Sequence, residues 1–264
     1  MSQTWSSPEP LRLHANRERA ESFGDVAVEY DRARPSYPEA LIDDLAALAP
    51  ADALDIGCGT GKAARLLAAR GIPVLGVELD AKMAQVARAH GIPVEVSSFE
   101  QWDDAGRQFD LAVSGQAWHW IDPVVGVPKV ARVLRPSGTL ALFWNVARLG
   151  GDIQAALSEV YRTHAPALLR PVVERDRGAD PPYAADLRTT GLFTTVEDRE
   201  YAWQRRYTRD EWVALIQTQS DHVLLDPEHR AALVAAVGAA IDRTGGVVEA
   251  PYVTHTVLAH RGAA

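Results

Sequence analysis

Residues 51–61 read ADALDIGCGTG, a short apolar run that ends at Asp55 and continues into alternating glycines. Glycine adds nothing to packing volume and loses more backbone entropy on folding than any other residue. Three glycines in five residues therefore indicate that another group comes close to the main chain. We interpret the stretch as a strand, a glycine turn and the start of a helix.

Around this turn the hydrophobic residues alternate between the two-residue period of strands and the 3.6-residue period of helices. This alternation predicts an α/β fold with a parallel sheet. Near-continuous apolar strands of this kind suit a sheet covered on both faces. The elements expected before residue 150 are helices over 38–50, 62–71, 80–91 and 122–135, a turn at 136–138, and further strands over 74–78, 93–97, 109–115 and 139–145.

The alternation of strand and helix patterns changes after the glycine pair at 150 and 151. We expect residues 1–150 to form a cofactor-binding core with an N-terminal strap, and residues 151–245 to form a mainly helical cover or substrate region. The cover contains one core strand near 194–204, and residues 246–264 supply the last core strand. Its other expected elements are helices over 152–163, 208–220 and 226–243, and a charged, proline-rich loop over 171–183.

The composition of the 264 residues, with 47% hydrophobic and 23% charged residues, is that of an ordinary globular protein. The net charge of −8 argues against a general binder of nucleic-acid backbones. No apolar run approaches 18 residues, and the first 22 residues lack the apolar centre of a secretory signal. We therefore expect a cytoplasmic protein with neither a membrane nor a nucleic acid as its partner.

The chain has a single cysteine, Cys58, inside the glycine turn. A single cysteine excludes an internal disulfide and a multi-cysteine zinc site. Two interpretations of Cys58 remain, a redox role and a small residue tolerated in a tight loop, and the second is favoured. The histidines at 222, 229, 255 and 260 lack metal-ligand spacing, so we expect no metal.

Two familiar nucleotide-binding loops fit the glycine turn poorly. A phosphate loop requires glycine where Ile56 stands and serine or threonine where Ala63 stands. A dinucleotide loop requires its third glycine at Lys62, which weakens but does not remove an NAD(P)-dependent oxidoreductase as an alternative. A plain strand-to-helix turn does not explain three glycines.

The segment DIGCGTG, residues 55–61, resembles motif I of the class I S-adenosylmethionine-dependent methyltransferases. The resemblance implies a Rossmann-like, seven-stranded, mostly parallel sheet flanked by helices, with a helical cover insertion. It also implies that S-adenosylmethionine is the cofactor. The loop would pack against the methionine part of the cofactor and Asp55 would help to order its amino acid end. The cofactor-binding residues expected here are Asp55, Gly57, Cys58, Gly59 and Gly61.

The ends of the next two expected strands carry further candidates. Glu78 ends an apolar strand at the same edge as the glycines, where a carboxylate can accept both hydrogen bonds of a ribose diol; a solvated carboxylate is the alternative. Leu79 and Met83 are expected to flank an adenine, although the helical spacing of Met83 also suits the core. Ser98 and Phe99, in the segment 97–102, resemble the family's adenine contact, and Phe99 as a core residue stays open.

The segment SGQAWHWID, residues 114–122, resembles the region after the fourth strand in the type 11 subgroup, which includes small-molecule and trans-aconitate methyltransferases. Ser114 and Gln116 are the candidates for lining the cofactor near its sulfur. Trp118 and Trp120 are expected to contact the substrate or form a lid, with local packing as the alternative. His119 is the candidate catalytic base for a hydroxyl acceptor, or a structural imidazole. A carboxylate acceptor requires no base.

The N-terminal segment 23–41 completes the resemblance. In the subgroup, a tyrosine precedes an Arg-Pro-x-Tyr-Pro stretch that closes over the cofactor as a lid. Here the matching residues are Tyr30, Arg34 and Tyr37, which we expect to be substrate or lid residues.

These observations predict transfer of a methyl group from S-adenosylmethionine to an oxygen, nitrogen or carboxylate of a small molecule. The alternatives are an NAD(P)-dependent oxidoreductase and a non-catalytic cofactor-binding protein. Methylation of a nucleic-acid base is disfavoured by the acidic balance and by SGQA at 114–117, where an N-P-P-Y-type segment would be required. The sequence leaves the acceptor's identity and the oligomeric state open.

Overall fold

The computed structural model describes residues 26–169, 182–223 and 225–262. Seven strands form one sheet in the order β3-β2-β1-β4-β5-β7-β6, which confirms the expected fold class. Strands β1 to β5 are parallel, and β7 is antiparallel to both of its neighbours. The strands are β1 (Ala53–Ile56), β2 (Val74–Glu78), β3 (Val94–Val96), β4 (Phe109–Gly115), β5 (Leu134–Ala147), β6 (Phe193–Thr208) and β7 (Val247–Arg261).

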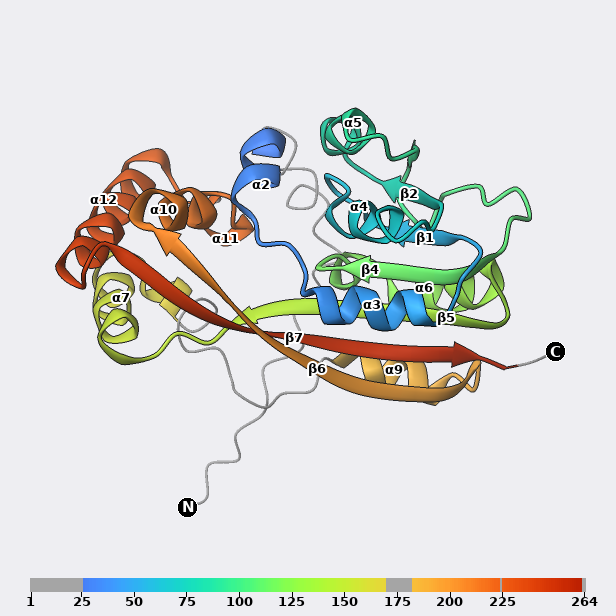
Figure 1. Ribbon diagram of the computed structural model, residues 1–264. Helices are drawn as coiled ribbons and strands as arrows, with labels where there is room; N and C mark the ends of the chain where they lie inside the picture. Colours follow the sequence, from blue (N-terminus) through green and yellow to red (C-terminus); the bar gives the residue numbers. More distant parts are fainter. Residues whose placement is uncertain (1–25, 170–181, 224, 263–264) are drawn as a thin grey trace, which may run out of the picture.

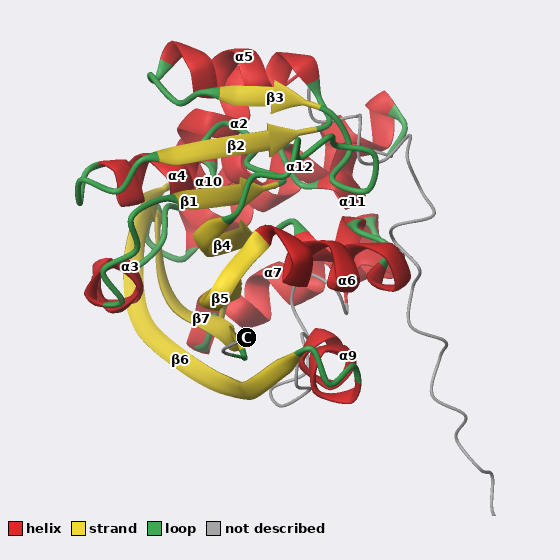
Figure 2. Cartoon of the chain, turned by 90° about the vertical axis from the view of Figure 1, so that its right-hand side faces the viewer, coloured by secondary structure: helices red, strands yellow, loops and turns green. Residues whose placement is uncertain are grey.

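Helices cover both faces of this sheet, as its apolar strands require. The residues of one buried cluster come from α3 (Glu39–Ala47), α4 (Lys62–Ala68) and α5 (Ala81–Ala89) on one face. A second cluster joins α6 (Pro123–Val133) and α9 (Pro182–Thr189) to the other face. Figure 2 shows α6 and α9 on one side of the strands and α3 and α4 on the other.

A third group of helices lies beyond the sheet. Strands β6 and β7 stay paired from Phe193 opposite Arg261 to Thr208 opposite Val247, and they run together to this group (Figure 1). Its helices are α7 (Gly151–His164), α10 (Arg209–Gln217), α11 (Ser220–Val223) and α12 (Pro227–Arg243). Helices α7, α10 and α12 share a separate apolar cluster with the far ends of β6 and β7.

The starts of the later helices follow from their capping residues. Thr208 and Glu211 form a reciprocal capping box at the start of α10, and the Asp226 side chain accepts a hydrogen bond from the main-chain N–H of His229 at the start of α12. Such caps satisfy main-chain donors that the first turn leaves unpaired. Both expected helix starts are confirmed.

One expected turn is wrong. Residues 136–138 lie inside β5, where the pairing with β4 shifts between Phe109 and Leu111. Ser137 there has a φ of 64°, so the proline and glycine produce an irregularity within a strand rather than a connection.

The N-terminal strap consists of α2 (Ala27–Ala33) followed by an extended stretch to α3. Helix α2 packs against α10 on one side and α5 on the other. Figure 1 shows it between the helices that lie beyond the sheet and the helices α4 and α5. Residues 23–25 of the expected strap and most of the expected loop at 171–183 lie outside the described residues. Within the described ranges, no helix has both the length and the apolar character needed to span a bilayer.

Candidate active site

A cavity of about 580 Å³ opens at the carboxyl ends of the parallel strands. This volume is in the range of ligand pockets, roughly 300–1,000 Å³. Its walls come from the glycine loop, the ends of β2, β3 and β4, the strap, and the helices beyond the sheet. One chamber therefore joins the cofactor candidates to the helical cover.

The glycine loop presents its main chain to this cavity at Gly57 and Gly59. Both have left-handed backbone conformations, with φ of 66° and 55°, which strongly favour glycine. A Cβ on Gly57 would lie 2.6 Å from the Cβ of Ala117. The loop is thus held against the segment after β4 at a distance that only glycine permits.

Glu78 is fixed beside this loop. Its Oε2 accepts a hydrogen bond from the main-chain N–H of Gly59 at 2.7 Å, and its Oε1 accepts one from Asp80 at 2.9 Å. Burial raises the pKa of this carboxyl above its ordinary value, although both hydrogen bonds act in the opposite direction. Each carboxylate oxygen can accept a further bond, and the residue lines the cavity.

Asp55 lies deeper at the end of β1 and is only 1% exposed. Its Oδ2 accepts a hydrogen bond of 3.1 Å from the main-chain N–H of Ala64 in the first turn of α4. Burial raises the pKa of Asp55 to about 7, and the negative charge of Glu78 acts in the same direction. Asp55 also lines the cavity. The cavity wall therefore includes a carboxyl whose pKa is raised to about 7.

Cys58 lines the cavity but is buried. A Cβ on Gly76 of β2 would lie 2.6 Å from its sulfur, so that glycine makes room for the thiol. Burial raises the pKa of the thiol well above its ordinary value, which suits a packed residue rather than a reactive thiolate.

Two predicted cofactor residues do not line the cavity. Gly61 is the N-cap of α4, and a Cβ there would lie 3.2 Å from Ala87 of α5. Ser114 is fully buried, and its hydroxyl donates to the carbonyl of Ile56 at 2.9 Å. Both residues position the loop and strands from outside the cavity, which corrects their predicted place in it.

The residues predicted to contact an adenine lie together on the cavity wall. Leu79, Met83, Ser98 and Phe99 all line the cavity, while Met83 and Phe99 are each only 4% exposed. Met83 and Phe99 are therefore both core residues and cavity residues, because each side chain is packed and has one side on the cavity.

Gln116 lines the cavity just after β4. It has a left-handed backbone conformation, with a φ of 59°. Its main-chain N–H donates to Phe143 at 2.9 Å and its side-chain amide donates to the carbonyl of Asn145 at 3.3 Å. These bonds hold an uncommon conformation for a residue other than glycine.

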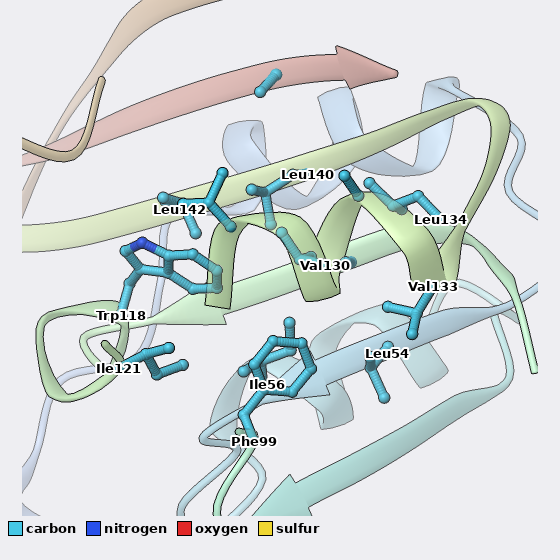
Figure 3. Packing of buried hydrophobic residues seen from close by; sticks show 14 of the residues in the cluster. Leu54, Ile56, Phe99, Trp118, Ile121, Val130, Val133, Leu134, Leu140 and Leu142 are labelled. Carbon is cyan, nitrogen blue, oxygen red and sulfur yellow. The ribbon is translucent and has the colours of Figure 1, made fainter. Parts of the chain in front are cut away.

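The two tryptophans after β4 have different places. Trp118 is 1% exposed and is absent from the cavity wall. It packs among Phe99, Ile121 and Leu142 beneath α6, as Figure 3 shows. The expectation of a lid or substrate contact is therefore wrong for Trp118, because α6 covers this indole completely. Trp120 does line the cavity.

His119 lines the cavity, and the indole Nε1 of Trp144 donates to its Nδ1 at 3.3 Å. An indole N–H can only donate, so the neutral imidazole carries its proton on Nε2. The lone pair that a general base would use is already engaged. This geometry presents His119 as a hydrogen-bond donor.

The three strap candidates all line the cavity. The ring of Tyr37 meets Phe143 edge to face at 4.7 Å, and burial raises the pKa of its phenol. The Arg34 guanidinium lies 5.0 Å from the ring centre of Tyr30, and its Nη2 donates to the carbonyl of Thr218 at 2.8 Å. The strap therefore reaches the cover directly.

The strap is also fastened to the cofactor side through Asp31, which no sequence pattern indicated. Its carboxylate accepts from Arg65 of α4 at 2.7 Å and contacts His90 at 3.0 Å. Its main-chain carbonyl accepts from Lys62 at 2.5 Å. Burial alone raises the pKa of Asp31, but the hydrogen bonds and the charges of Lys62 and Arg65 outweigh it, so the pKa is lowered.

Several cavity residues from the cover and from β7 were also not predicted individually. They are Leu157, Tyr161, Trp212, Leu215, Gln219 and Asp221 of the cover and Tyr252 of β7. The apolar stripe of 212–216 indicated a cover helix, whereas α12, which has a similar stripe, contributes nothing to the cavity wall. Within the described ranges, no group of three or more His, Cys, Asp or Glu side chains has the arrangement of a metal site.

The strand order and the glycine loop at the end of β1 define the class I methyltransferase fold. The family model described as a methyltransferase domain matches residues 54–142. Uncharacterized methyltransferases of Mycobacterium tuberculosis and Mycobacterium bovis are each 34% identical over 211 residues, which span 78% of this chain and 79% of each relative. The chain therefore belongs to this family, and it is an S-adenosylmethionine-dependent methyltransferase.

Solved structures share the fold. A candidate type II methyltransferase from Anaeromyxobacter dehalogenans superimposes with a TM-score of 0.65 at 23% identity, over 88% of this chain and 99% of that chain. Phosphoethanolamine N-methyltransferase 2 of Haemonchus contortus, solved with S-adenosyl-L-methionine, gives a TM-score of 0.52 at 16% identity, over 99% of this chain and 61% of that chain.

Proposed function

We propose that this enzyme methylates an oxygen, nitrogen or carboxylate of a small molecule enclosed between the sheet edge and the helical cover. The observation that supports this most is the continuity of the cavity, which runs from Gly57 and Glu78 to Tyr161, Trp212 and Tyr252. Its volume of about 580 Å³ suits a nucleoside cofactor beside a small acceptor.

The chain's residues fit the cofactor on the sheet side. Glu78 is placed to accept hydrogen bonds from both ribose hydroxyls, and the bare main chain of Gly57 and Gly59 allows close approach. Phe99 and Met83 offer apolar walls to an adenine, and Asp55 offers a carboxylate to an ammonium group. Bound there, the cofactor supplies a methyl group already activated by its sulfonium.

The protein then has to orient the acceptor atom and keep bulk water away. Tyr30 and Tyr37 of the strap, Trp120 and the cover residue Trp212 enclose the chamber. We assign no proton abstraction to His119, whose Nδ1 is engaged by Trp144. His119 lines the chamber, where its imidazole can contact the acceptor.

A panel experiment tests this function. Purified enzyme is incubated with methyl-labelled S-adenosylmethionine and, separately, with carboxylic acids, phenols, amines, duplex DNA and tRNA. We expect labelled product from at least one small-molecule class and none from the nucleic acids. Label recovered only in nucleic acid, or in no acceptor at all, would contradict the proposal.

A further inference from the structure

Arg34 lines the cavity, and its guanidinium is only partly hydrogen-bonded within the described residues. Its Nη2 donates to the carbonyl of Thr218, while its Nε is buried without any partner. No ion pair joins Arg34 to any carboxylate within the described ranges. By contrast, Arg65, Arg107 and Arg135 each pair with a carboxylate at 2.7 Å.

The surroundings of Arg34 do not neutralise its charge. Beside the Tyr30 ring, the cover contributes Tyr161 and Trp212 to the same chamber, and β7 contributes Tyr252. His222 is fully buried. Its Nε2 and the Tyr161 hydroxyl share a hydrogen bond of 2.7 Å. Burial lowers the pKa of His222 to about 4, and the charge of Arg34 acts in the same direction, so this imidazole is neutral at physiological pH.

Two carboxylates on the cofactor side of the chamber, those of Glu78 and Asp55, have hydrogen-bond partners other than Arg34. Glu78 accepts from two main-chain N–H groups and Asp55 accepts from Ala64. The other cation of the chamber wall, Lys62, donates to the main chain of Asp31. A partly buried guanidinium without a counterion is costly, and its planar fork suits an oxyanion.

We propose that the acceptor carries an anionic oxyanion group, such as a carboxylate or phosphate, that Arg34 binds. The apolar or aromatic body of the acceptor lies against Tyr161, Trp212 and Tyr252. This inference rests on the proposed function, because it names the substrate class of the same chamber. Asp221 also lines the cavity, so a cationic acceptor is the competing outcome.

The test measures binding of small probes to the enzyme saturated with S-adenosylhomocysteine. The probes are phenylacetate, phenyl phosphate, neutral phenylacetamide and cationic phenethylamine, titrated calorimetrically. An added charge-assisted hydrogen bond contributes about 1.5–3 kcal/mol, so we expect an oxyanion probe to bind at least roughly tenfold more tightly than phenylacetamide. The two oxyanions, compared with each other, distinguish a carboxylate from a phosphate.

Three variants assign this preference to Arg34. Arg34→Met removes the charge, whereas Arg34→Gln also removes it but keeps an N–H donor for Thr218. Both should bind phenylacetate and phenylacetamide equally. Arg206→Met is the matched control, because Arg206 is exposed on β6 and pairs with Glu249; it should keep the preference. Circular dichroism checks that each variant is folded.

Several results would overturn the inference. They are equal binding of charged and neutral probes by the wild-type enzyme, tighter binding of phenethylamine, no oxyanion binding at millimolar concentration, or an unchanged preference in folded Arg34→Gln. Affinity for S-adenosylhomocysteine is measured separately. If wild-type enzyme binds it but shows no oxyanion preference, only this inference fails. If wild-type enzyme does not bind it, the proposed function fails as well.

Discussion

The main-chain N–H of Gly59 donates a 2.7 Å hydrogen bond to Oε2 of Glu78. This bond joins the glycine loop after β1 to the end of β2, so two segments 19 residues apart form one polar surface at the sheet edge. The position of that carboxylate depends on the loop's conformation. Changes in either segment should therefore affect cofactor binding together with local stability.

Gly57→Ala should destabilise the protein more than left-handed strain alone. A left-handed conformation costs a residue with a side chain about 1–2 kcal/mol, and overpacking adds roughly 1–3 kcal/mol. The added Cβ would lie 2.6 Å from Ala117. We expect a loss of about 2–5 kcal/mol in the free energy of unfolding in urea, with loss of S-adenosylhomocysteine binding.

Gly106→Ala is the matched control for this strain. Gly106 has a φ of 74°, and a Cβ there would meet no atom within 4 Å. Its substitution should cost only the left-handed strain and leave cofactor binding intact. Equal destabilisation by the two substitutions would show that the contact with Ala117 has no role.

The raised pKa of Asp55 predicts that cofactor binding releases a proton. Because its folded pKa is about 7, above the ordinary value of about 3.9, protonation of Asp55 stabilises the free protein at low pH. That stability is lost as the pH rises through 7. A cationic ligand group favours the carboxylate, so affinity for S-adenosylhomocysteine should rise up to about tenfold per pH unit below 7 and then level off.

Calorimetry at pH 6 in buffers of different ionisation enthalpy measures the protons released. We expect close to one proton in the wild-type enzyme and none attributable to this site in Asp55→Asn, which keeps an oxygen acceptor for Ala64. The same proton release from both proteins would rule out Asp55 as its source.

His119→Asn should reduce methyl transfer only modestly. The asparagine oxygen can still accept from Trp144, while the donor toward the acceptor is altered. A general base contributes about 10²–10⁴-fold, so we expect a decrease below roughly tenfold in single-turnover rate, with the acceptor found in the panel. A decrease beyond a hundredfold that also removes a limb of the pH–rate profile would restore His119 as the base.

Asp31→Asn should loosen the strap. At neutral pH the Asp31 carboxylate is ionised because its pKa is lowered; its stabilising effect is lost only as the pH falls through that lowered value. For partly exposed pairs we expect an effect of about 1 kcal/mol, which is a roughly fivefold faster release of S-adenosylhomocysteine. Stopped-flow dissociation and hydrogen exchange over 27–33 measure it.

Glu29→Gln makes the same chemical change on an exposed position of the same helix and should leave both quantities unchanged. If the two variants behave alike, the contacts of Asp31 with Arg65 and His90 do not hold the strap. Raising the salt concentration should speed release from the wild-type enzyme more than from Asp31→Asn, because salt screens these pairs.

Much of the fold could be predicted because each element carries its own local signal. The apolar runs at 74–78 and 109–115 coincide with β2 and β4, and Thr208 and Asp226 mark helix starts by their capping chemistry. The glycine loop was predictable for a similar reason. Its left-handed backbone conformations require glycines that stand close together in the chain.

Contacts between distant segments explain what sequence reasoning missed. Trp118 and Trp120 are two residues apart and chemically identical, yet only the position of α6 decides which one is buried. Asp31 gains its role from Arg65 and His90, which lie in other elements. The cavity contribution of Tyr161 likewise depends on how α7 packs against α12 and the far ends of β6 and β7.

We expect Glu78 to hold the cofactor's ribose beside the glycine loop. Calorimetric titration with S-adenosylhomocysteine, on wild-type, Glu78→Ala and the exposed β7 control Glu249→Gln, tests it most directly. Loss of two charge-assisted hydrogen bonds at about 1.5–3 kcal/mol each predicts at least a roughly hundredfold weaker affinity for Glu78→Ala. Glu249→Gln should bind as the wild type does. A folded Glu78→Ala enzyme that retains wild-type affinity would show that Glu78 does not hold the ribose.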